Sequence, residues 1–178
     1  KTWESLGEWT VLMRDDCFVF ECQDLLPSTN YAFRLRAHNA FGLGKAGEHS
    51  EWFQSLESKP STPDQPQQLS WDGVWIALGW KHLPGPTDST RDNGSNILFY
   101  EVERKEMATN EICTNWNKIL TVPDRFCDYR EAEPLALERW FRVRAKNACG
   151  YSEWSQAKHV ILRRLTVAEQ QAQRLRRK

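Results

Sequence analysis

The chain contains one pattern twice, as Phe33-Arg-Leu-Arg-Ala-His-Asn-Ala-Phe-Gly42 and again as Phe141-Arg-Val-Arg-Ala-Lys-Asn-Ala-Cys-Gly150. Seven of the ten positions are identical, and the two copies lie 141 − 33 = 108 residues apart. Ser-Glu-Trp follows each copy, at 50–52 and at 152–154. A spacing near one hundred residues is typical of tandem domains, because solenoid repeats have periods of roughly 20–50 residues.

Both copies alternate between apolar and charged side chains. In the second copy Phe141, Val143 and Ala145 share one face, and Arg142, Arg144 and Lys146 share the other; the first copy has the same order. Alternation with a period of two predicts strands that have one buried face and one face in water.

Further short strands are predicted around the second copy. They cover residues 74–80, 97–105, 116–122, 125–129 and 155–163, and turn sequences such as Asp92-Asn93-Gly94 and Pro123-Asp124 separate them. No helical periodicity lies between them, so the sequence indicates packed antiparallel sheets. The Pro/Ser/Gln-rich stretch 58–67 has no periodicity and is interpreted as a linker between domains.

The first copy resembles a known family. Leu25-x-Pro27-x-Thr29-x-Tyr31 before the repeated pattern resembles the tyrosine corner and strand F of fibronectin type III domains. The resemblance implies that the Tyr31 hydroxyl bonds to nearby backbone and that Trp80 is the core tryptophan of strand B. The second copy departs from the pattern, since Arg139 stands at the position of Tyr31. We expect the corner to be absent or rebuilt there.

The expected fold is therefore all-β: immunoglobulin-like fibronectin type III β-sandwiches of Greek-key topology, with a short C-terminal α-helix. Residues 1–57 are expected to form the C-terminal half of one domain, 58–67 the linker, 68–165 a complete domain and 166–178 a basic helix. Thr166 and Glu169 have the spacing of a capping box, which predicts the start of that helix. The chain is expected to be a segment of a longer protein.

A second resemblance concerns Tyr151-Ser-Glu-Trp-Ser155, which is similar to the Trp-Ser-x-Trp-Ser signature of haematopoietic cytokine receptors. It implies that Arg142 and Arg144 sandwich the ring of Trp154. It likewise implies that Arg34 and Arg36 sandwich Trp52. Each exposed cation–π contact contributes on the order of 0.5–1 kcal/mol. The alternative is that this ladder stiffens the sheet and binds nothing.

Aromatic and basic side chains are the candidates for contact with a partner, because aromatic residues and arginine dominate interface hot spots. The candidates are Trp75, Trp116, Trp140, Arg174, Arg176 and Arg177, and the further tryptophans to test are Trp3, Trp9 and Trp71. For each tryptophan the alternative is cover by neighbouring strands. For the C-terminal helix the alternative is a solvated tail.

Composition and motifs argue against several classes of function. The formal net charge is +0, so no global field attracts nucleic acid or an anionic membrane. The four histidines lack metal-ligand spacing, and no phosphate-binding loop or nucleophile elbow is present. We therefore expect no catalytic residue, no cofactor and no metal, and we expect that the protein is not an enzyme.

Cysteine usage bears on the compartment. The five cysteines are odd in number and contain no Cys-x-x-Cys pair, which argues against a disulfide framework and favours a reducing compartment. Asn93-Gly94-Ser95 is an N-glycosylation sequon, which is used only in a secreted protein.

The expected function is a non-catalytic scaffold that contacts other proteins within a larger intracellular assembly, with no small-molecule substrate, no nucleic acid and no membrane span in this segment. The alternative is a segment of an extracellular adhesion or cytokine-receptor-like ectodomain. Free thiols favour the first, whereas disulfides or a glycan on Asn93 favour the second.

Overall fold

A computed structural model describes the chain at residues 3–4, 12–14, 17–82, 92–106, 115–131, 137–163, 165–169 and 172. The described elements are strands, apart from the helical residues 167–169 and 172. The predicted all-β fold with a short C-terminal helix is therefore confirmed. None of the described helical residues belongs to a helix with the length and hydropathy that a bilayer-spanning segment requires.

Two antiparallel sheets form a sandwich. One sheet has the order β11-β8-β7, from β7 (Gln67–Trp71), β8 (Trp75–Gly79) and β11 (Phe126–Arg130). The other has the order β10-β9-β12-β13, with β14 also paired to β12. Its strands are β9 (Phe99–Glu106), β10 (Asn117–Val122), β12 (Leu137–Asn147), β13 (Gly150–Tyr151) and β14 (Lys158–Leu162). The chain changes sheet after β8, β10 and β11, as the predicted Greek-key topology requires.

The core lies between these two sheets. Phe141 and Val143 of β12 are fully buried and point at the opposite sheet, where Leu78 is equally buried. Trp80, directly after β8, packs edge-on against Tyr100 with ring centroids 5.5 Å apart. Each large apolar side chain buried in this way contributes about 1.5–3 kcal/mol. Trp80 therefore occupies the core position that the resemblance implied.

The strand β7 was not predicted, and its first residue Gln67 falls in the expected linker. Leu69 points into solvent and only Trp71 at its end is buried, so no alternation marks this edge strand. The preceding segment also packs on the sandwich: Pro63 and Pro66 are buried. Proline lacks an N–H group, so it suits the border of an edge strand.

The last predicted strand, 155–163, is shorter than expected, because serine hydroxyls replace part of its ladder. The Oγ atoms of Ser152 and Ser155 accept the backbone N–H groups of Ala145 and Val143, each at 3.0 Å. Regular pairing with β12 resumes at Lys158. The Ser-Glu-Trp-Ser stretch therefore stays attached to β12 without being a regular strand.

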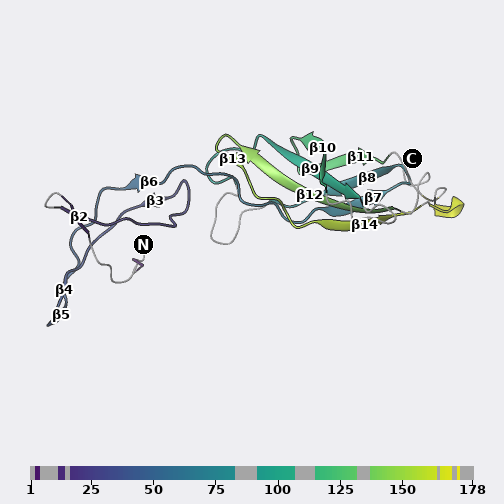
Figure 1. Ribbon diagram of the computed structural model, residues 1–178. Coiled ribbons are helices and arrows are strands. Elements are labelled where there is room, and N and C mark those ends of the chain that lie inside the picture. Colours follow the sequence, from purple (N-terminus) through teal and green to yellow (C-terminus); the bar gives the residue numbers. More distant parts are fainter. Residues whose placement is uncertain are drawn as a thin grey trace.

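An N-terminal unit precedes the sandwich, and the strands among its described residues are all short. They are β1 (Leu12–Arg14), β2 (Cys17–Val19), β3 (Asn30–Tyr31), β4 (His38–Asn39), β5 (Gly42–Leu43) and β6 (Phe53–Gln54). Figure 1 shows this unit at one end of the molecule and the sandwich at the other, with β13 at the end of the sandwich that faces the unit. The Tyr31 hydroxyl accepts the Leu26 N–H at 2.8 Å, so the implied tyrosine corner is confirmed.

The inner face of the N-terminal unit is open. Leu35 is 75% exposed, whereas Val143, its equivalent at an offset of 108 residues, is fully buried. Phe33 and Phe53 stack with ring centroids 5.7 Å apart and line a hollow of about 560 Å³. The unit therefore carries the apolar pattern of the sandwich core without an opposing sheet among the described residues.

In the sandwich a buried ionic cluster replaces the tyrosine corner. Arg139, at the position of Tyr31, is 3% exposed, and its Nε donates to Glu131 at 3.3 Å. Arg104 Nη1 donates to both carboxylate oxygens of Glu131, at 2.8 and 3.0 Å, and to the Tyr129 hydroxyl at 2.9 Å. The corner is therefore rebuilt from two arginines that share one carboxylate.

Candidate functional site: the outer faces of the sandwich

The outer face of the β9–β12 sheet carries a continuous stack of aromatic rings and cations. The Cζ atoms of Arg142 and Arg144 each lie 4.4 Å from the ring centroid of Trp154, on β12 opposite the Ser-Glu-Trp-Ser stretch. Arg142 also lies 4.2 Å from the Trp116 ring, and Arg144 lies 4.0 Å from the Tyr151 ring. The arrangement matches the geometry that the cytokine-receptor resemblance implied for Trp154.

Carboxylates on β9 hold this ladder in place. Glu103 accepts Arg142 Nε and Nη2 at 2.8 and 2.6 Å, and Glu101 accepts the same atoms of Arg144 at 3.0 and 2.7 Å. Burial raises the pKa of Glu101, but hydrogen bonds from Arg144 and Lys118 outweigh it and hold the pKa below its usual value. Charges and rings are thus paired with one another, which leaves little unsatisfied chemistry for a ligand.

The sequence did not indicate these carboxylates or the place of Trp116. Glu101 and Glu103 lie two residues apart on the same face of β9, and the strand register places them opposite Arg144 and Arg142 of β12. Opposite charges directly across two strands stabilise a sheet. This pairing was not identified, because it depends on which strands are neighbours.

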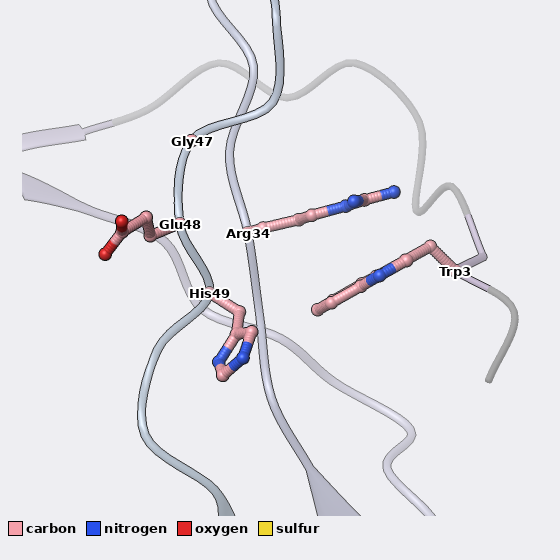
Figure 2. Close-up of a pocket in the computed structure, with 5 residues that line it drawn as sticks. All are labelled: Trp3, Arg34, Gly47, Glu48 and His49. Carbon is pink, nitrogen blue, oxygen red and sulfur yellow. The ribbon is translucent and has the colours of Figure 1, made fainter.

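The N-terminal unit has a related but different stack. Arg34 lies over the ring of Trp3, with its Cζ 4.2 Å from the centroid, and Figure 2 shows the two planes lying against each other. His49 lies on the same side, 6.1 Å from Trp3 and 6.3 Å from Trp52. The sandwich of Trp52 between Arg34 and Arg36 stays a prediction.

The outer face of the β7–β8–β11 sheet carries three large exposed apolar side chains beside the exposed Asp128 and Arg130 of β11. Leu69, Trp75 and Phe126, each from a different strand, are 63%, 46% and 58% exposed. Phe126 is paired with Gly79, and the Leu69 side chain covers that glycine so closely that an added Cβ would lie 2.9 Å from Leu69 Cδ1. Trp75 lies on the same face of β8, beyond Ala77. The three side chains therefore belong to one surface, which we call the apolar face.

The other proposed contact residues are placed differently. Trp116 is stacked in the ladder, and Trp140 is stacked on His159 with centroids 4.5 Å apart. Trp71 is buried and its indole N–H donates to the Arg163 carbonyl at 2.9 Å, so its proposed role as a contact anchor is wrong. Trp9 and the C-terminal arginines, Arg174, Arg176 and Arg177, lie outside the described residues.

The C-terminal helix starts as its sequence predicted. Glu169 accepts the backbone and side-chain donors of Thr166, both at 2.9 Å, which forms the capping box. Arg163 adds two hydrogen bonds to the same carboxylate, at 3.0 and 2.6 Å. The Arg163 guanidinium and the Thr166 donors together lower the pKa of Glu169 to about 2. Leu165 packs against the core, which joins the helix to the sandwich.

The described residues show little that could serve catalysis. No group of three or more His, Cys, Asp and Glu side chains among them could hold a metal ion. Cys22, Cys127 and Cys149 are free thiols. Burial raises the pKa of the Cys127 thiol to about 12, which suppresses the reactive thiolate.

The known proteins that this chain is similar to are long, and the matched region is a small part of each. No protein-family model matches the chain. Sidekick-1 of Mus musculus is 27% identical over 160 residues, covering 84% of this chain and 7% of that protein. Contactin rig-6 of Caenorhabditis elegans is 26% identical over 112 residues, covering 62% of this chain and 9% of that protein. Ephrin type-A receptor 4-A of Xenopus laevis is 32% identical over 135 residues, covering 74% of this chain and 13% of that protein.

A solved structure has the same architecture. The crystal structure of chicken CNTN1 FN1–FN3 domains matches 79% of this chain and 45% of that chain, with a TM-score of 0.52 and 21% identity. The chain therefore has the fibronectin type III fold, an immunoglobulin-like β-sandwich.

Proposed function

We propose that this chain is a non-catalytic protein–protein interaction module that serves as a scaffold within a larger assembly. In this proposal residues 1–57 are the C-terminal half of one fibronectin type III domain, 58–67 the linker, 68–165 a complete domain and 166–178 a basic helix. Each relative named above is much longer than the matched region, which covers 7% to 13% of it. This supports a role as one module among several.

The apolar face is the observation that carries the proposal. Soluble monomers rarely expose a contiguous apolar patch of several large side chains, and such patches mark interaction sites. Leu69 and Phe126 meet over Gly79, and Trp75 lies on the same face at the other end of β8, where Asp128 and Arg130 of β11 stand beside it. The ladder on the opposite sheet is already paired within the chain. We therefore place the main partner on the apolar face, with Trp75 and Phe126 as its anchors.

Crosslinking tests this placement. A photoreactive amino acid in place of Ala77, in the middle of the apolar face, should capture a protein partner in cells. The same group in place of Lys118, whose side chain is 56% exposed beside the ladder, is the matched control. Capture from position 118 and not from position 77 would refute the placement.

The captured partner then allows affinities to be measured. Trp75→Ala and Phe126→Ala should each weaken binding by about thirtyfold, since an anchor side chain contributes about 2 kcal/mol. Ile161→Ala removes an equally exposed apolar side chain from the other sheet and should leave the affinity unchanged. Equal effects of all three substitutions would contradict the proposal.

A second candidate is a segment of an extracellular adhesion or receptor ectodomain. The stack around Trp154 and the similarity to an ephrin receptor favour it. The free thiols of Cys22, Cys127 and Cys149 favour the scaffold, because they suit a reducing compartment. Mass spectrometry of protein from its native source separates the two: intact thiols support the scaffold, and disulfides or a glycan on Asn93 support the ectodomain.

A further inference from the structure

The connection between the N-terminal unit and the sandwich lies against the turn at residues 92–95. The backbone carbonyl of Asn93 accepts the Ser58 N–H at 3.1 Å, and its side-chain Nδ2 donates to the Lys59 carbonyl at 2.5 Å. One residue of the sandwich thus binds two consecutive residues of the connecting segment. These bonds fix the direction in which the chain enters the sandwich.

A buried asparagine holds the same segment from the sheet side. Asn147, at the end of β12, is fully buried, and its Nδ2 lies 2.7 Å from the Ser58 carbonyl and 3.0 Å from the Asp92 carbonyl. Its Oδ1 accepts the N–H groups of Cys149 and Gly150, at 2.9 and 3.1 Å. Ser58 is therefore bonded to the turn through its N–H and to β12 through its carbonyl.

Side chains close the contact from both ends. An added Cβ on Gly94 would lie 2.4 Å from Ser28 Cβ, so the turn of the sandwich touches the N-terminal unit. The Lys59 side chain lies on Gly150, where an added Cβ would be 3.2 Å from it. Positive φ angles gather here: +50° at Ser28, +56° at Asn93, +87° at Gly94 and +143° at Gly150. Such a backbone persists at a non-glycine residue when its surroundings hold it.

We infer that Asn93 is a clamp that holds the N-terminal unit at a fixed angle to the sandwich, and that the clamp and an N-glycan at this residue exclude each other. The nitrogen that would carry the sugar is the one bonded to Lys59. Ser95, which completes the sequon, is 7% exposed. The folded junction therefore engages the acceptor nitrogen and buries the recognition residue. The inference uses the proposed division into two units but not the proposed contact face.

Two substitutions separate the clamp from the sequon. Asn93→Asp preserves the shape of the side chain and its tolerance of positive φ, but it replaces the donor with an oxygen that repels the Lys59 carbonyl. Ser95→Ala also destroys the sequon but leaves Asn93 intact. Nitrogen-15 relaxation then gives rotational correlation times for residues 20–57 and for the sandwich. We expect one shared time in the unmodified chain and in Ser95→Ala, and two separate times in Asn93→Asp, with unchanged amide shifts in the sandwich core.

A steric test serves if Asn93→Asp impairs folding. Gly94→Ala should separate the two correlation times by driving the added methyl group into Ser28, and Ser28→Gly in the same chain should restore part of the shared tumbling. If both Asn93→Asp and Gly94→Ala kept one shared correlation time, the inference that Asn93 acts as a clamp would be refuted. Expression through a secretory pathway tests the exclusion. A glycan on Asn93, detected as a mass shift that peptide N-glycosidase removes, would overturn the exclusion if the chain still tumbled as one body.

Discussion

Removal of the Glu131 carboxylate should destabilise the sandwich more than any exposed ion-pair substitution. Glu131 is the shared acceptor of Arg104 and Arg139, and its side chain is 2% exposed. The Arg104 and Arg139 side chains are 16% and 4% exposed, so water has little access to replace the lost partner. Removal of one member of a buried pair costs roughly 3–5 kcal/mol, because it leaves an uncompensated buried charge.

Urea unfolding followed by tryptophan fluorescence measures this effect. For a domain with an m-value near 2 kcal/mol per M, Glu131→Ala should lower the midpoint by roughly 1.5–2.5 M. Glu138→Ala is the matched control, because its side chain is 47% exposed and paired with His159 at the surface. An exposed pair contributes about 0–1 kcal/mol, so the control midpoint should move little.

A single result would refute this reasoning. If Glu131→Ala and Glu138→Ala shifted the midpoint equally, the cluster would not be holding two buried charges. A second variant tests the cause: Arg104→Met and Arg139→Met combined with Glu131→Leu should recover much of the loss, because an apolar cluster of similar volume carries no unpaired charge.

Two further predictions concern the ladder and the helix. Trp154→Ala removes the ring between two guanidinium groups and should cost about 1–2 kcal/mol in urea unfolding, from two contacts of roughly 0.5–1 kcal/mol each; Trp154→Phe should cost less, and an equal loss would show that the ring does not matter. The side chain of Glu169 should titrate by NMR with a pKa of about 2. Because this value lies below the ordinary one, its contribution to the helix start is present at neutral pH and is lost as pH falls towards 2. Arg163→Ala should raise the pKa towards its ordinary value, and no change would contradict the assigned cause.

The strands with one buried face could be predicted from the sequence, and the edge strand could not. Phe141 and Val143 alternate with arginines, and the structure buries the first pair and turns the arginines outward. In β7 only Trp71 is buried, so the hydrophobic period that marks a strand is missing. Hydrogen bonds from a neighbouring strand define such an element, and a local pattern does not contain them.

The candidate site was predicted in part for the same reason. The stack of Arg142 and Arg144 on Trp154 follows from a motif that is local in the chain. The place of Trp116 in that stack depends on tertiary structure, since it brings together residues that are 26 and 38 positions apart. Of the apolar face only Trp75 was named from the sequence, because Leu69 and Phe126 come together only through the pairing of strands that are not neighbours in the chain.

The sequence by itself determined the β-sandwich, the tyrosine corner and the helix cap, since each depends on spacings of a few residues that sterics and hydrogen bonding enforce locally. Tertiary structure decided which charged residues are buried and which aromatic residues remain in water. Arg139 shares the inward face of Phe141 and Val143, and its charge can be buried there because Glu131, eight residues earlier in the chain, accepts its Nε and also binds Arg104 from another strand. Burial and charge pairing are properties of neighbours in space, so they emerge only when the two sheets are packed together.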